Sequence, residues 1–202
     1  MSVLRNTLNM RNLSPLSLLV LTACGGGNST TSTFLTSASG KVIKGPLNNA
    51  LVGLDYDGDG VVDSATVRTD ENGAYSISTT QKTYTVIAVT DESTVDTSSG
   101  TVLSGVTLKA PEGATVITPT TTLMKEGNLT VEQVASVLGL PDGVDPLTFN
   151  PYADGVSASD ALAVEKASQQ VMSVVNAFAS AAEGAGDEAM RQLGLINHPD
   201  RA

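Results

Sequence analysis

Ala65-Thr-Val-Arg-Thr-Asp-Glu-Asn-Gly-Ala-Tyr-Ser-Ile-Ser78 is the stretch that decides the fold of this chain. Apolar or small side chains recur there at every second position, as in Tyr75 and Ile77, and this period is typical of a β-strand with one buried face. Asp70-Glu-Asn-Gly73 separates the two runs, and asparagine and glycine tolerate the positive φ angles of a tight turn. The stretch therefore predicts a turn with a strand on each side.

Further strands are predicted on both sides of this turn. Runs rich in valine, isoleucine and threonine, some of them weak, lie at residues 41–43, 51–55, 83–89, 105–108 and 114–117. Short strands separated by turn residues at this spacing favour an antiparallel β-sandwich. We therefore expect an α+β chain in which residues 40–118 form a sandwich module and residues 119–186 a small helical region.

The apolar period changes to 3.6 residues beyond Pro119, which indicates helices. Thr130 and Gln133 have the spacing of a capping box, and a valine-rich stripe follows until Gly139. A longer helix is predicted from about residue 157 to 183, before an irregular tail at 187–202. Its apolar face either packs on the rest of the fold or binds a partner, and consists of Val164, Ala167, Val171, Val174, Val175, Phe178 and Ala182.

The first 23 residues have the features of a secretory targeting segment. Two arginines precede an apolar stretch, Leu13 to Ala23, that is too short to span a bilayer. It ends Leu21-Thr-Ala-Cys24, which resembles the lipobox of bacterial lipoproteins. The resemblance implies cleavage before Cys24, lipidation of its thiol and, since Gly26 follows, an outer-membrane or cell-surface location. The alternative is an ordinary secretory peptide in which the cysteine falls here by chance.

Composition narrows the range of partners and activities. Residues 24–39 are mainly glycine, serine and threonine, which predicts a flexible tether between lipid and domain. The formal net charge of −10 argues against nucleic acid as a partner, because phosphates are bound by lysine and arginine. The one histidine, His198, lies in the predicted tail, so histidine-based catalysis has no support. We therefore expect a membrane partner through the lipid, and no enzyme activity.

Asp55-Tyr-Asp-Gly-Asp-Gly-Val-Val-Asp63 is the internal motif with the clearest chemistry. Calcium takes about six to eight oxygen ligands, and acidic side chains at alternate loop positions can supply them. Asp55, Asp57 and Asp59 stand at the first, third and fifth positions. Val61 would offer its backbone carbonyl at the seventh, and Asp63 stands at the ninth. The pattern is similar to EF-hand and dockerin-type loops and predicts that these five residues bind calcium.

The same loop departs from that pattern at its twelfth position. Thr66 stands where the related loops have a bidentate carboxylate, and the missing ligand is expected from one of three acids that the sequence does not distinguish: Asp70, Glu71 and Asp91. Val62, at the eighth position, is expected to point inward. A polar Asp-Gly turn that holds no metal is the alternative.

Several segments resemble a known module: Gly40-Lys-Val, Asn49-Ala-Leu-Val-Gly-Leu, Thr69-Asp-Glu-Asn-Gly-Ala-Tyr-Ser-Ile and Thr83-Tyr-Thr-Val. Together they are similar to the carboxypeptidase-regulatory-like module and to the B-type repeats of bacterial surface adhesins. Both are transthyretin-like or immunoglobulin-like sandwiches. The resemblance implies a lipid-anchored, extracytoplasmic structural or adhesive module, with a cell-surface protein or a glycan as partner. The alternative is a carbohydrate- or peptide-binding accessory lipoprotein of an uptake or degradation system.

Overall fold

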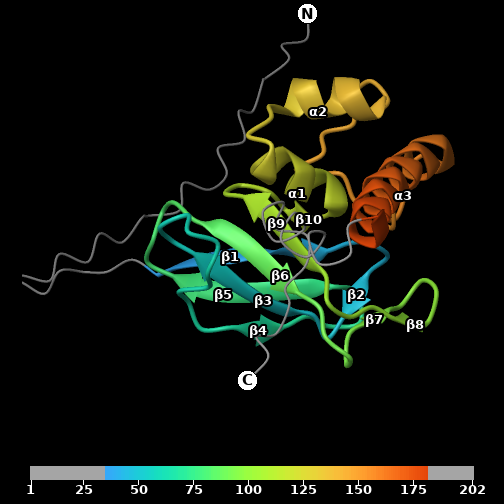
Figure 1. The fold of residues 1–202 in the computed structure, drawn as a ribbon. Helices are drawn as coiled ribbons and strands as arrows, with labels where there is room; N and C mark the ends of the chain where they lie inside the picture. The colour runs from blue at the N-terminus through green and yellow to red at the C-terminus, as the bar shows by residue number, and fades with distance from the viewer. Residues whose placement is uncertain (1–34, 182–202) are drawn as a thin grey trace, which may run out of the picture. The chain divides into compact units, whose positions relative to one another are not determined.

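The computed structural model describes residues 35–181, with their side chains as far as Val174. This part of the chain mixes helices with several mainly antiparallel sheets, which confirms the α+β class (Figure 1). The strands are β1 (Thr36–Val42), β2 (Leu47–Asn48), β3 (Leu51–Asp55), β4 (Val67–Arg68), β5 (Ala74–Thr79), β6 (Thr85–Val89), β7 (Val95–Asp96), β8 (Thr101–Val102), β9 (Thr107–Pro111) and β10 (Val116–Ile117). The helices are α1 (Pro119–Glu126), α2 (Val131–Leu138) and α3 (Ala158–Ala181).

The strands form sheets in the orders β10-β1-β5, β4-β3-β6-β9 and β2-β7-β8. Neighbouring strands are antiparallel except β1 and β10, which run parallel. The predicted turn is present: Gly73 has φ 74°, and Asp70 Oδ1 accepts hydrogen bonds from the amides of Asn72 and Ala74. Its two strands nevertheless belong to different sheets, because β4 pairs with β3 and β5 pairs with β1. The turn therefore connects two sheets.

One buried cluster receives side chains from both larger sheets. Tyr75 and Ile77 are 6% and 4% exposed, whereas the intervening Ser76 is exposed, as the alternation predicted. The cluster also contains Val42 of β1, Leu54 of β3 and Leu108 of β9, each fully buried. Aliphatic side chains supply nearly all of this core, because aromatic residues make up only 3% of the chain.

Strand β1 begins within the segment predicted to be a tether. Residues 36–39 pair with β5 in a continuous antiparallel register that starts at Thr36 and Thr79. Ser37 and Ser39 are exposed, whereas Ala38 between them lies in the core. One small apolar residue among polar neighbours is a weak signal of alternation. The tether was therefore predicted to extend to residue 39, whereas the strand begins at Thr36.

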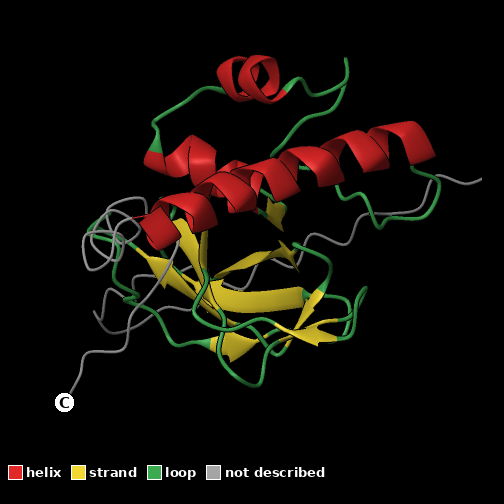
Figure 2. Ribbon diagram, turned by 45° about the vertical axis from the view of Figure 1, so that its right-hand side comes forward, coloured by secondary structure: helices red, strands yellow, loops and turns green. Residues whose placement is uncertain are grey.

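Helix α1 connects the helical region to the strands (Figure 2). It packs on β9, and both α2 and α3 contact α1. Thr118 and Thr121 form a capping box at its start, and the hydroxyls of Thr121 and Thr122 donate to the carbonyl of Lys109 in β9. Residues 35–181 lie within one compact unit of the chain. In the described part of the chain, no helix is long and apolar enough to cross a membrane.

Candidate metal centre

The acidic loop begins where β3 leaves the core and closes on that same strand. Asp55 is the last residue of β3. The amides of Asp63 and Ser64 donate to the carbonyl of Leu54 over 2.8 and 3.2 Å, and Ser64 Oγ accepts from the Leu54 amide over 2.8 Å. The two ends of the loop are thus fixed to one buried residue, which positions the carboxylates between them.

Asp55 is held by the loop backbone. Its residue is only 2% exposed, and its two carboxylate oxygens accept hydrogen bonds from the amides of Gly58 at 2.7 Å and Gly60 at 3.0 Å. These glycines have φ angles of 83° and 90°, which residues with a Cβ rarely adopt. The loop backbone therefore wraps around Asp55.

Three of the four predicted carboxylates come together. One oxygen from each of Asp55, Asp57 and Asp63 lies within 4.8 Å of the others, so this cluster could hold a metal ion. Two oxygens bound to one calcium, each at about 2.3–2.6 Å, are separated by no more than about 5 Å. Asp63 Oδ2 also accepts from the Tyr56 amide over 2.7 Å, which fixes its direction across the loop.

Asp59 and Val61 lie at the exposed tip of the loop. Asp59 Oδ1 accepts from the Val61 amide over 2.7 Å, and Asp59 is not part of the three-carboxylate cluster. Val61 is 62% exposed. Val62 is half-buried and packs against Gly53 of β3. The contact is so close that a Cβ on Gly53 would lie 2.2 Å from Cγ1 of Val62. The inward direction predicted for Val62 is thereby confirmed. The predicted lipidation site, Cys24, lies outside the described residues.

The three acids considered for the missing ligand lie near the opposite end of β3. The amide of Thr69 donates to the carbonyl of Ala50, which places the Asp70–Glu71 turn there. Asp91 follows β6, whose Val89 pairs with Leu51. Arg68 bonds Asp91 over 2.7 Å and holds the pKa of that carboxyl below its usual range. These acids therefore do not complete the cluster.

Glu112 is an acid that sequence reasoning missed. A hollow of about 230 Å³ adjoins the loop, and its lining includes Asp55, Asp57, Tyr84, Glu112 and Lys125. The sheet register explains this proximity. Asp55 pairs with Thr85 of β6, and Thr85 pairs with Pro111 of β9, the residue before Glu112. Only these long-range strand pairings could have pointed to Glu112. Burial raises the pKa of Tyr84, and the negative charge of Glu112 raises it further.

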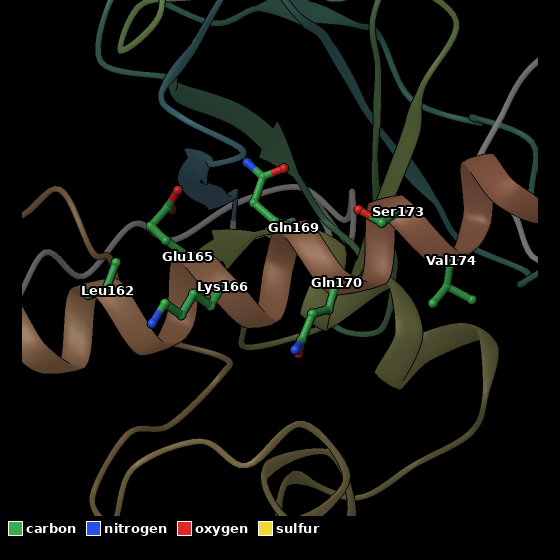
Figure 3. A pocket seen from close by; sticks show the side chains of 7 residues that line it. All are labelled: Leu162, Glu165, Lys166, Gln169, Gln170, Ser173 and Val174. Atoms are coloured by element: carbon green, nitrogen blue, oxygen red, sulfur yellow. The ribbon is translucent and has the colours of Figure 1, made fainter.

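A second hollow lies along the outer side of α3 alone (Figure 3). Its volume is about 540 Å³, and its lining residues form two rows on the helix: Leu162, Glu165, Gln169 and Ser173, then Lys166, Gln170 and Val174. The opposite face of α3 is buried at Val164, Ala167 and Val171, which confirms that much of the predicted packing face. Val174 was placed on that face wrongly and is 55% exposed. At 100° per residue it lies about 60° around the helix from Val171, where it lines the outer hollow with Lys166 and Gln170.

Comparison with known proteins gives no match: no family model, no curated protein and no solved structure matches this chain.

Proposed function

We propose that this protein is a lipid-anchored, extracytoplasmic structural or adhesive module whose β-domain is stabilised by calcium. One observation carries the proposal: Asp55, Asp57 and Asp63 converge at the end of a strand that lies in the core. An ion at this place would tie the loop to β3 and so stabilise the folded state. The role is structural, and no catalytic group is assigned.

Calcium is the ion that suits this cluster best. The converging ligand atoms are all carboxylate oxygens, which hard cations prefer. Asp57 and Asp63 are exposed, so water molecules could complete the coordination shell, and Asp59 could reach the ion through water. With no carboxylate at the twelfth position, we expect the weak affinity of extracellular modules, a Kd of about 10⁻⁴–10⁻³ M.

Two further features support the proposed type of module. The strands of the two larger sheets share one core, which agrees with a transthyretin-like or immunoglobulin-like sandwich. The described part begins at residue 35, so the predicted lipidation at Cys24 and the outer-membrane or cell-surface location follow from the sequence alone.

Calcium is expected to raise the melting temperature of the mature chain carrying Cys24→Ser, which keeps it free of lipid. At a tenfold excess over Kd, an ion that binds only the folded state stabilises it by about 1.4 kcal/mol. For a protein of this size that corresponds to roughly 3–6 °C. Thermal melts with calcium and with a chelator measure the shift, and calorimetry measures the binding.

Asp57→Asn should abolish this shift, because it removes a ligand charge without touching the bonds that hold Asp55. Asp154→Asn, which removes the same charge from an exposed loop before α3, should leave the shift intact. The proposal would be contradicted by an unchanged melting temperature at about 10 mM calcium, an order above the expected Kd. An equal loss of the shift in both variants would also contradict it.

Cys24→Ala is expected to prevent lipid attachment. The wild-type protein should incorporate labelled palmitate and fractionate with membranes, because its acyl chains contribute about 0.8 kcal/mol per buried methylene. The variant should remain unlabelled and unprocessed or be released. Equal labelling of the two proteins would reject lipidation at this residue.

A further inference from the structure

Strand β1 has one edge that is only partly paired. The amide of Lys41 donates to the carbonyl of Thr115 over 3.0 Å, on the side of β1 that faces β10. Peptide groups two residues apart point to the same edge of a strand, so the amides of Ser37 and Ser39 point to that side as well. Strand β10 pairs only with Lys41 and Val42. Among residues 35–181, no strand therefore covers this edge of β1 from Thr36 to Gly40.

A hollow of about 200 Å³ adjoins this open edge, with a lining that includes residues 37–39 and 113–115, Tyr75, Tyr84 and Val86. Ala38, Tyr75, Val86 and Ala114 belong to the buried core cluster, so the hollow opens into the core between the two sheets. No charged residue lines it. A cavity of about 150 Å³ can hold benzene, so this hollow has room for one apolar side chain.

Tyr75 brings a polar group into the hollow. The residue is 6% exposed and lines the hollow. Burial, and then the neighbouring Tyr84, raise the pKa of Tyr75, so its hydroxyl keeps its proton and remains a donor. A backbone carbonyl entering the hollow could accept a hydrogen bond from this hydroxyl.

We propose that an extended peptide of a partner protein pairs with the open edge of β1 and inserts one apolar side chain between Tyr75 and Tyr84. Main-chain bonds to Ser37 and Ser39 would supply affinity, and the hollow would select the inserted side chain, as in strand addition to other sheet edges. The adjoining hollow, which Tyr84 also lines, carries three acids, Asp55, Asp57 and Glu112, against one base, Lys125, and the whole chain is acidic. The partner is therefore a peptide with a basic residue near its apolar anchor. The interaction does not require a metal at the acidic loop.

The test uses the mature chain with Cys24→Ser and a capped seven-residue peptide in which threonines alternate with valine, leucine and lysine. Titration gives Kd, and amide hydrogen exchange followed by NMR shows which backbone groups become protected. We expect the exchange of the Ser37 and Ser39 amides to slow by at least about tenfold, since each gains an interstrand hydrogen bond. The same result is expected with calcium and with a chelator, which separates this inference from the metal site.

Ser39→Pro is the decisive variant, because it removes one outward amide from an edge strand, where proline is tolerated. It should weaken binding by about tenfold or more. The matched control is Ser78→Pro: Ser78 is exposed on β5 and, by the same alternation, its amide points away from β1. That variant should bind within about twofold of the wild type. Should Ser39→Pro fail to fold, the same peptide with N-methyl groups on the residues facing β1 tests the pairing on the unaltered protein.

Several results would overturn the inference. Equal binding of the methylated and unmethylated peptides would show that no strand is added. Protection of Ser37 and Ser39 before any peptide is added would mean that the chain itself or a second copy fills the edge, and its dependence on protein concentration distinguishes these two. Neutral oligosaccharides that bind at Tyr75 and Tyr84, where the peptide does not, would assign the hollow to a glycan.

Discussion

Val171→Asp is expected to lower the free energy of unfolding by about 3–5 kcal/mol, the cost of placing an unpaired charge in a packed interface. Val171 is 7% exposed on α3, beside Ala167 at 2% and Met172 at 6%. Met172 belongs to the same buried cluster as the β-strands. The loss should therefore appear as one cooperative transition at least about 6 °C lower. Circular dichroism and calorimetric melts measure it.

Gln169→Asp is the matched control for that variant. It introduces the same residue two positions away, on the exposed outer side of α3 (Figure 3). Its cost should be limited to the lower helix propensity of aspartate, a few tenths of a kcal/mol. If the two variants melted together, α3 would not be packed through Val171, and its apolar face would be available to a partner.

Glu126→Gln is expected to have the second-largest effect. Lys109 Nζ of β9 lies 2.7 Å from Glu126 Oε1 of α1, and the two side chains are only 14% and 18% exposed. Removing the carboxylate leaves the lysine charge mostly buried without its partner. The expected cost is about 2–4 kcal/mol, somewhat below that of a fully buried pair. Urea or thermal unfolding of the variant measures it.

The Arg68–Asp91 pair is a natural comparison, because its N–O distance is also 2.7 Å but its side chains are 41% and 43% exposed. Asp91→Asn should therefore cost only a small fraction of what Glu126→Gln costs. The double variant Lys109→Met with Glu126→Leu should recover most of the loss, since it leaves no unpaired charge. Equal destabilisation by Glu126→Gln and Asp91→Asn would contradict a role for burial at the first pair.

Local signals in the sequence predicted the elements that local interactions stabilise. Helix α2 spans Val131–Leu138 with its capping box from Thr130 to Gln133 and a left-handed Gly139 at its end, all as expected. The sequence did not predict helix α1 as a separate helix within the helical region at residues 119–186. Its Pro-Thr-Thr-Thr start has poor helix propensity and no apolar stripe. The hydroxyls of Thr121 and Thr122 donate to the carbonyl of Lys109, a tertiary contact, whereas the buried hydroxyl of Thr120 has no partner among the described residues.

The candidate metal centre likewise has a part that depends on local sequence and a part that depends on long-range strand pairing. The aspartate spacing pointed to the loop as the candidate site, and the bonds that hold Asp55 in it span only a few residues. Glu112 could not be predicted, because it reaches the loop through the pairing of three strands. For the same reason the sequence did not show that the two strands beside the Asp70–Gly73 turn belong to different sheets: their pairing partners are distant in sequence.

The parallel pairing of β1 with β10 has a consequence for the order of folding. Strands β7 and β8, and the contact of α1 with Lys109, join residues that are close in sequence, so they can form at low entropic cost. Strand β1, in contrast, obtains its second neighbour only from Val116 and Ile117. If the chain is exported from its N-terminus, as proposed above, the pairing of β1 with β10 has to wait for most of the domain to arrive. On the proposed export route, Lys41 and Val42 would therefore gain their second neighbour only after Val116 and Ile117 have arrived, although β5 can pair with β1 earlier.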